Sequence, residues 1–412
     1  MNRTDQPAPA AHRLTTPWGD VDLTRFPADP RDQLRAWDAA DTYLLKHLAE
    51  NRTDLSGAVV VVGDRWGALG TALTGADGCS PTLISDSYLG QQATGENLAR
   101  KDTAGAGATL LTTQDTPPDR VDVLLVRVPK SLALLEEQLH RLRPALHEGT
   151  VVIGTGMVKE IHTSTLNLFE RIIGRTRTSL AEKKARLIFS TPDLSLSPGR
   201  NPWPLRYQLP DGIGPLAGRT VVNHAGVFCA ERLDIGTRFL LRHLPRGAEA
   251  TRIVDLGCGN GVVGTSAALT SPDAEILFTD ESHQAVASAE ATYAENCGDR
   301  PGKAVFRAGD GLADVPDASV DLVLNNPPFH THQATTDATA WRMFAQAHAA
   351  LRPGGELWVV GNRHLGYHLK LRRLFGTSEL VASDPKFVIL KAVRQDGSSK
   401  RERGRDQRAQ RP

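Results

Sequence analysis

A repeated strand-and-glycine pattern constrains the fold of this chain more than any other feature. Residues 59–63 and 253–257 each read as an apolar strand that ends in glycine, and an aspartate, Asp86 or Asp280, lies 23 residues beyond each glycine. Further apolar strands alternate with helical stretches after both segments, which predicts right-handed βαβ units on a parallel sheet. The sequence therefore predicts an α/β protein with two doubly wound domains that arose by duplication.

Composition suggests where these domains begin and end. Proline and glycine gather between the two copies, notably at Asn201–Pro204 and Pro210–Gly212, and such stretches are typical of a linker or an extended arm. A helix is expected from Arg31 to Ala49, where apolar residues recur at helical spacing. The predicted division is a lead-in at 1–30, a first domain at 31–191, a linker at 192–219, a second domain at 220–394 and a basic, disordered tail at 395–412.

The two copies differ at the positions where chemistry is expected. With a shift of 194 residues, the first copy replaces Asp255 and Gly259 with Val61 and Arg65. After the fourth strand, the segment 127–130 (Arg-Val-Pro-Lys) stands where the second copy has Asn-Pro-Pro-Phe. An arginine would crowd a loop that must approach a ligand closely. The first domain is therefore expected to be degenerate and to serve stability and substrate contact.

The glycine turn of the second copy predicts a nucleoside cofactor. Its Gly-x-Gly-x-Gly sequence lets the backbone turn sharply and approach a ligand, although glycines after a strand are also ordinary turn residues. A dinucleotide is the alternative, but it favours a third glycine three residues on and a pyrophosphate at the helix N-terminus. S-adenosylmethionine has no phosphate and needs room for its amino-acid end instead. The turn consists of Gly257, Cys258, Gly259, Asn260 and Gly261.

Three acids are expected around this cofactor. Asp280 ends the second strand, where a carboxylate can accept both ribose hydroxyls. Asp255 lies at the end of the first strand and would orient the loop or meet an amino group. Asp310, followed by Gly311 after a third strand, would accept from the adenine amine.

A stiff turn after the fourth strand, Val320–Leu324, predicts the reaction. Pro327 and Pro328 lack N–H groups and fix φ, so the carbonyl of Pro327 and the side-chain oxygen of Asn326 can accept the two protons of a planar amine. Two such acceptors would aim the nitrogen lone pair at a methyl donor, which is positioning and electrostatic stabilisation. Phe329 would stack on the nucleobase that carries the amine, and this nucleobase must be unstacked or single-stranded to reach the site. The alternative is an ordinary Pro-Pro turn with Phe329 in the core.

These motifs together resemble class I S-adenosylmethionine-dependent methyltransferases with Rossmann-like domains. More narrowly, the chain is similar to the ribosomal-RNA guanine-N2 methyltransferases of the large-subunit methyltransferase G and small-subunit methyltransferase C group, which carry two tandem methyltransferase-like domains, the first degenerate. The matching segments are His224–Phe228, Leu233–Gly236, Val254–Gly261, Asn326–His330, Asp337–Trp341, Gly361–Leu365 and Lys386–Lys391.

The resemblance implies methylation of the exocyclic N2 of a guanine in ribosomal RNA. It implies that Asn326 also lies beside the cofactor, that Phe228, Phe329 and His330 meet the substrate, and that Asp234 lies near the cofactor or the pocket entrance. Asn362–Leu365, with Phe329 and His330, favours the large-subunit (23S) branch. Alternatives are 16S guanine N2, adenine N6, protein glutamine, and a non-catalytic RNA-binding assembly factor with a vestigial site.

Composition and charge limit what can be expected of the RNA surface, the cellular compartment, membrane spans and metal sites. The net charge of +1 shows no overall electropositive footprint, so an RNA surface would be local, as in the basic tail. The four cysteines form no Cys-x-x-Cys pair, which fits a reducing cytoplasm and gives no sign of a zinc ribbon. No apolar run reaches 18 residues, so no membrane span is expected, and no third ligand accompanies His364 and His368 as a metal site. The duplication would let a monomer suffice.

Overall fold

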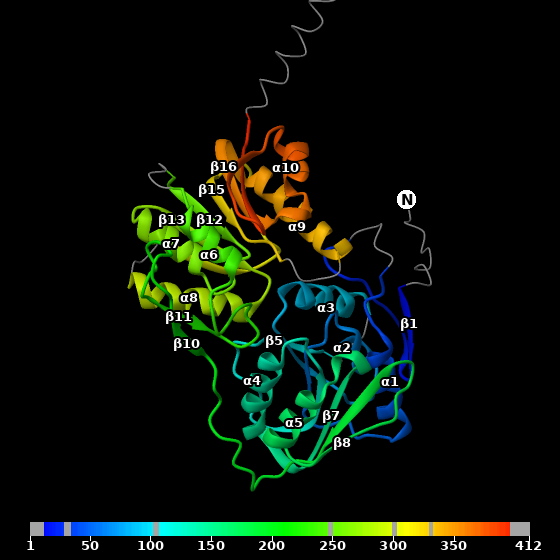
Figure 1. Ribbon diagram of the computed structural model, residues 1–412. Helices are drawn as coiled ribbons and strands as arrows, with labels where there is room; N and C mark the ends of the chain where they lie inside the picture. The colour runs from blue at the N-terminus through cyan, green and yellow to red at the C-terminus, as the bar shows by residue number, and fades with distance from the viewer. Residues whose placement is uncertain are drawn as a thin grey trace, which may run out of the picture. The chain divides into compact units, whose positions relative to one another are not determined.

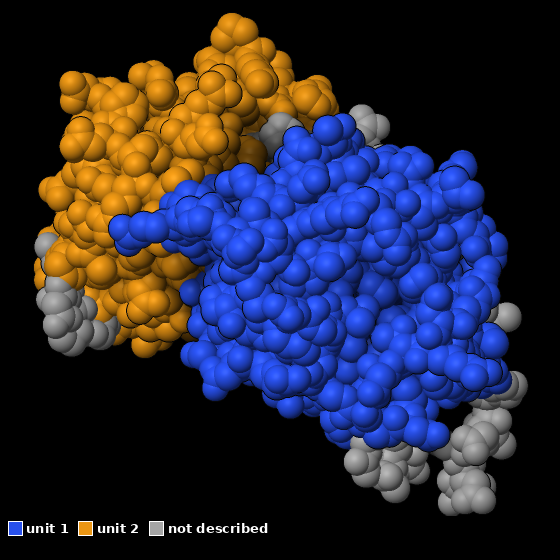
Figure 2. Space-filling view, turned by 90° about the horizontal axis from the view of Figure 1, so that it is seen from below, with its two compact units in different colours: residues 1–203 blue, residues 204–412 orange. Residues whose placement is uncertain are grey.

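A computed structural model describes residues 12–28, 34–101, 107–245, 250–298, 303–328 and 333–395, with the backbone alone at 333–336. The chain divides into two compact units, residues 1–203 and 204–412, which Figure 2 colours separately. Each unit is built around one seven-stranded mixed sheet, and the α/β prediction is therefore confirmed. Within the described residues, no helix is long and apolar enough to cross a membrane.

The sheet of unit 1 has the strand order β5-β4-β3-β6-β7-β9-β8, in which the first five strands are parallel and β9 is antiparallel to both of its neighbours, β7 and β8. A hairpin of β1 (Arg13–Thr16) and β2 (Gly19–Asp22) precedes it. The strands are β3 (Val59–Val62), β4 (Thr82–Ser85), β5 (Thr109–Thr112), β6 (Val121–Arg127), β7 (Leu146–Met157), β8 (Thr176–Thr178) and β9 (Ala185–Ser190). The helices are α1 (Ala39–Glu50), α2 (Ala68–Leu73), α3 (Tyr88–Arg100), α4 (Leu132–Leu142) and α5 (Thr163–Ile172).

The sheet of unit 2 has the order β14-β13-β12-β15-β16-β18-β17, which is the same topology. The strand order reverses at β12, where open α/β sheets bind their ligands. The strands are β12 (Arg252–Leu256), β13 (Glu275–Asp280), β14 (Ala304–Ala308), β15 (Val320–Asn325), β16 (Leu351–Asn362), β17 (Glu379–Ser383) and β18 (Phe387–Val393). The helices are α6 (Ile235–Arg242), α7 (Val262–Thr270), α8 (His283–Cys297), α9 (Gln333–Ala350) and α10 (Tyr367–Phe375).

Two hydrophobic layers enclose the sheet of unit 2, with α6, α7 and α8 on one face and α9 and α10 on the other (Figure 1). Successive residues of a strand point to opposite faces. From Leu322 onward in β15 and from Leu357 onward in β16, even-numbered apolar residues accordingly lie in the layer of α6, and odd-numbered ones lie in the layer of α9, whereas Val320, which precedes an irregularity in the pairing, lies in the layer of α9. The even set includes Leu322, Leu324, Trp358 and Val360, and the odd set includes Val323, Leu357 and Val359.

The ends of the first domain differ from the prediction. Helix α1 begins at Ala39 and not at residue 31, because Asp38 caps it by accepting a hydrogen bond from the backbone N–H of Ala40. The β1–β2 hairpin lies inside the predicted lead-in, where the short strands carried little apolar periodicity. The capping aspartate was the signal for the true start of the helix.

The predicted linker is only partly a linker. Strand β10 (Leu205–Gln208) lies within it and pairs antiparallel with β11 (Thr220–Asn223). Leu209, Ile213 and Leu216 are buried in the core of unit 2. The second half of the stretch is therefore a packed arm of unit 2, while the predicted tail beyond residue 395 lies outside the described residues.

Candidate functional site

The glycine turn joins β12 to α7 with three left-handed residues. Gly257, Gly259 and Gly261 have φ of +71°, +52° and +75°, and Gly261 caps α7. A Cβ at Gly261 would lie 2.6 Å from the Cα of Ala289 on α8, so no other residue fits there. A Cβ at Gly259 would meet nothing within 4 Å. The turn is thus packed at its end and open at its centre, which suits the close approach of a ligand.

Two predicted cofactor residues hold this turn in place. Asp255 is buried, and its Oδ2 accepts a hydrogen bond from the Gly264 N–H at 2.7 Å. Burial raises the pKa of Asp255 to about 8. Asn260, also buried, donates from Nδ2 to the Oδ1 of Asn223 on β11 at 2.9 Å. These contacts join Asp255 to the first turn of α7 and tie the glycine turn to the β10–β11 hairpin, while the role of Asp255 toward the cofactor stays a prediction.

The structure brings Asp280 to the glycine turn. Its Oδ2 accepts a hydrogen bond from the Gly259 N–H at 3.0 Å, and its Oδ1 accepts one from the Ser282 N–H at 3.1 Å. Both oxygens of the Asp280 carboxylate therefore accept backbone hydrogen bonds at the end of β13. Asp280, at the end of β13, is therefore in direct contact with the glycine turn that follows β12.

Helix α9 positions the third predicted segment. Gln346 donates from Nε2 to the carbonyl of Asp310 at 3.0 Å and accepts from the Leu312 N–H at 3.2 Å. Arg342 pairs with the carboxylate of Asp310 at 3.1 Å, and Gly311 has φ of +57°. Sequence reasoning missed Gln346 and Arg342, which lie four residues apart on a helix whose contacts are decided only by the fold.

Asn326 immediately follows β15 and points to the face of α6. Its Nδ2 donates to the Oγ1 of Thr237 at 2.9 Å, and the Thr237 N–H donates to Asp234 Oδ2 at 2.9 Å, where Asp234 caps α6. Asn326 Oδ1 is buried and has no hydrogen-bond partner within the described part of the chain. A buried amide oxygen without a partner costs about 1–3 kcal/mol, so this atom is suited to a donor that the free protein lacks.

Other predicted substrate residues are placed only in part. Pro327 is buried and Pro328 is exposed. Phe228 is 49% exposed on the segment between β11 and α6. Phe329 and His330 lie outside the described residues, so their predicted roles stay predictions. In the described residues, no group of three histidine, cysteine, aspartate or glutamate side chains could hold a metal ion.

The corresponding place in unit 1 is filled by side chains. Strand register aligns Val126 with Asn325, which puts Arg127 at the position of Asn326. Arg127 is fully buried and forms ion pairs with Asp38 (2.6 Å), Asp41 (3.2 Å) and Glu160 (3.1 Å). The same comparison of registers shows that Ser85 is the unit 1 equivalent of Asp280. Asp86 lies one residue beyond that position, although it is the same number of residues from its glycine as Asp280.

Arg65, at the position of Gly259, extends this ion cluster. It pairs with Asp38 at 3.3 Å and with Glu160 at 2.8 Å. Burial opposes ionisation of Glu160, but the hydrogen bond and charge of Arg65 and the charge of Arg127 outweigh it and lower the pKa to about 2. The two arginines and their partners thus occupy the place of the glycine turn and the Asn-Pro-Pro turn.

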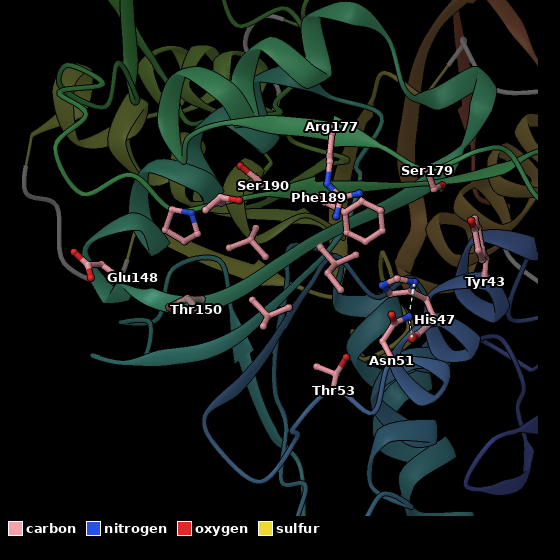
Figure 3. Close-up of a pocket in the computed structure, with 15 residues that line it drawn as sticks. Tyr43, His47, Asn51, Thr53, Glu148, Thr150, Arg177, Ser179, Phe189 and Ser190 are labelled. Carbon is pink, nitrogen blue, oxygen red and sulfur yellow. Dashed lines mark hydrogen bonds between the residues drawn. The ribbon is translucent and has the colours of Figure 1, made fainter.

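Unit 1 also contains a hollow of about 670 Å³ that is separate from the predicted site (Figure 3). The ring of Phe189 contacts the Arg177 guanidinium at 4.4 Å and the His47 ring at 5.0 Å. None of the predicted cofactor or substrate residues lines this hollow.

Comparison with known proteins assigns the site of unit 2 to the S-adenosylmethionine-dependent methyltransferases. Residues 218–391 match the family described as "Methyltransferase small domain", and residues 11–194 match the family described as "RLMG N-terminal domain". The protein is an enzyme of this class, and the predicted cofactor is confirmed.

The chain belongs to the ribosomal RNA large subunit methyltransferase G family. It is 71% identical to the Streptomyces avermitilis protein of that name over 381 residues, 92% of this chain and 99% of the relative. It is 49% identical to the Ectopseudomonas mendocina protein over 379 residues, again 92% of this chain and 99% of the relative. The family-level prediction is therefore confirmed.

A solved structure shares the fold of both units. The T. thermophilus 16S rRNA N2 G1207 methyltransferase, determined with AdoMet and guanosine, superposes with a TM-score of 0.70. The similarity covers 93% of this chain and 97% of that one, at 19% sequence identity.

Proposed function

We propose that this protein transfers a methyl group from S-adenosylmethionine to the exocyclic N2 of a guanine in 23S ribosomal RNA. The close relatives are named for the large ribosomal subunit RNA. The observation that best supports the chemistry is the buried Asn326 Oδ1, an acceptor with no donor among the residues of unit 2 that the structure describes. An exocyclic amine supplies the donor that this atom lacks.

The turn after β12 and the acid after β13 would hold the cofactor. The open side of Gly259 accommodates close approach, and the Asp280 carboxylate, which lies against the Gly259 N–H, is assigned to the ribose hydroxyls. Asp310 is assigned to the adenine amine, with its loop held by Gln346. Asp255 and Asn260 act on the cofactor through the turn that they brace. When bound, S-adenosylmethionine supplies an electrophilic methyl group.

The Asn-Pro-Pro turn would orient the target amine. Because Thr237 holds the Nδ2 of Asn326, its Oδ1 is the atom left to accept an amine proton. The carbonyl of Pro327 accepts a hydrogen bond from the second N–H of the amine, and the two acceptors turn the nitrogen lone pair toward the methyl donor. Phe329 stacks on the base, and Phe228 and His330 complete the substrate contacts.

The two units are proposed to have arisen by duplication, with the first degenerate. Their sheets share one strand order, and the ion cluster around Arg127 fills the position of the reaction site in unit 1. The domain at 31–191 would then support RNA binding and stability, and the domain at 220–394 would catalyse. We further propose that the enzyme acts as a monomer in the cytoplasm, where its rRNA substrate is found.

The direct test is to map methylated guanines in rRNA from cells that lack the protein. One N2-methylguanine of 23S rRNA is expected to be missing and to return when purified protein and S-adenosylmethionine are added to the extracted RNA. A missing mark in 16S rRNA, on adenine N6 or on a protein glutamine would instead support the corresponding alternative. Unchanged methylation of all of these would support a non-catalytic assembly factor.

Replacing Asp280 with alanine is expected to weaken S-adenosylmethionine binding by roughly 10- to 100-fold, because a charge-assisted hydrogen bond contributes about 1.5–3 kcal/mol. Calorimetric titration of the full chain measures the effect. Asp273→Ala, which removes an exposed carboxylate from the segment before β13, is the matched control and should bind normally. Equal affinities of the two variants would contradict the ribose assignment.

A further inference from the structure

Asn362 ends β16, the strand beside β15, and lies on the same sheet face as Asn326. Both residues are even-numbered, like the nearest apolar residues of β15 and β16 that pack in the layer of α6, which are Leu322, Leu324, Trp358 and Val360. The parallel register pairs Asn325 with Val359, so Asn362 lies two residues beyond the position opposite Asn326. With strands about 4.8 Å apart and a rise of about 3.3 Å per residue, the two Cα atoms are roughly 8 Å apart.

The beginning of α6 links these two asparagines. Asn362 pairs in register with Phe387 of β18, and a Cβ on Gly236 would lie 3.0 Å from the ring of Phe387. The next residue of α6, Thr237, holds Asn326. The first turn of α6 therefore contacts Asn326 itself and the strand partner of Asn362, which places the two asparagines near the same helix end.

The backbone at Asn362 is held firmly. The Arg363 N–H donates to the carbonyl of Lys386 at 2.9 Å, and the Arg363 guanidinium donates to the carbonyl of Asp384 at 2.6 Å. These bonds continue the pairing of β16 with β18 beyond the last residue of the strand. Asn362 is thus on a rigid element, as a residue that selects a substrate must be.

The side-chain oxygen of Asn362, like that of Asn326, is a buried hydrogen-bond acceptor with no donor in the described residues. Two acceptors on one face, each without a donor, fit a ligand that presents two neighbouring donors. The Watson–Crick edge of guanine does so, because the N1–H lies beside the N2 amine. Adenine presents an acceptor at N1 beside its amine.

We infer that Asn362 is a specificity-determining residue whose Oδ1 accepts the N1–H of the target guanine. The inference rests on the proposed function, since it assigns the second donor of the same base. This contact explains why an enzyme with an amine-binding Asn-Pro-Pro turn would methylate guanine and reject adenine. With adenine in the site, Asn362 Oδ1 and adenine N1 would be two acceptors facing each other with no proton between them.

Asn362→Leu, which keeps the side-chain size but removes the acceptor, is expected to lower kcat/KM by roughly 10- to 100-fold. The substrate is protein-free rRNA from cells that lack the protein, and the full chain is used. Asn362→Asp retains an acceptor and should stay within about fivefold of the wild type. Asn201→Leu, which changes an exposed asparagine, is the matched control.

Nucleoside binding separates recognition from a structural role. The wild type and Asn362→Asp should prefer guanosine to 1-methylguanosine, which lacks the N1–H, and this preference should shrink in Asn362→Leu. All variants should bind S-adenosylmethionine equally. Normal kcat/KM in Asn362→Leu, or an unchanged preference for guanosine, overturns the inference while leaving the proposed function intact. Failure of the wild type to methylate guanine N2 overturns both.

Discussion

Replacing Asn326 with alanine is expected to slow methyl transfer by about 100- to 1,000-fold, the usual effect of removing one group that stabilises a transition state. The loss should fall mainly on kcat. The buried Asn326 Oδ1 has no partner in the described part of the chain, so we assign its hydrogen bond to the reacting amine. Single-turnover transfer of labelled methyl groups to unmodified rRNA measures the effect.

A second variant tests whether the orientation of Asn326 matters. Thr237→Val removes the hydroxyl that accepts from Nδ2 at 2.9 Å but keeps the shape of the side chain. It should reduce the rate by about tenfold, between the effects of Asn326→Ala and of the exposed control Asn201→Ala. The mechanism is wrong if Asn326→Ala transfers methyl groups at the wild-type rate.

Arg127→Met is expected to destabilise unit 1 by about 3–5 kcal/mol, because it leaves buried carboxylates without their counter-ion. Arg127 is fully buried and pairs with Asp38, Asp41 and Glu160. Hydrogen exchange followed by mass spectrometry should show faster opening of β6 and α1. The wild-type contribution of Glu160, whose pKa is lowered to about 2, is present above its ordinary value near 4.5 and is lost as the pH falls toward 2.

The matched control is Arg171→Met, which breaks an exposed ion pair with Glu136 and should cost no more than about 1 kcal/mol. S-adenosylmethionine binding by unit 2 should be unchanged in both variants, because the ion cluster lies wholly in unit 1. Equal exchange rates in Arg127→Met and Arg171→Met would show that the cluster does not hold unit 1 together.

Much of the fold could be predicted because its signals are local. Apolar runs, the glycines that follow them and the acid at Asp280 lie within short windows, and all reappear at the expected strand ends. Equal spacing in the sequence was a less reliable signal. Asp86 is as far from Gly63 as Asp280 is from Gly257, but the strand register shows that Ser85 is the equivalent of Asp280. Two segments can have the same number of residues between a glycine and an aspartate and still pair their strands in registers that differ by one residue. The register, and not the spacing, then decides which residue faces the site.

Composition left open an outcome that burial decides. The proline and glycine content of 192–219 indicated a linker or an extended arm, and in the structure Leu209, Ile213 and Leu216 are buried and β10 pairs with β11. The arm reaches the glycine turn through Asn223 and its hydrogen bond to Asn260. Neither contact has a sequence signal, because the partners come from different elements.

By itself, the sequence determined that this chain folds as two α/β units and that the second carries a methyltransferase site, because strand periodicity and turn chemistry depend on neighbouring residues. Only the tertiary structure decided which polar atoms are satisfied. Thr237 and Asn326 are 89 residues apart, and their hydrogen bond is what leaves Oδ1 for the substrate. Hydrogen-bond partners that meet across a folded sheet are set by packing and register, which no short stretch of sequence records.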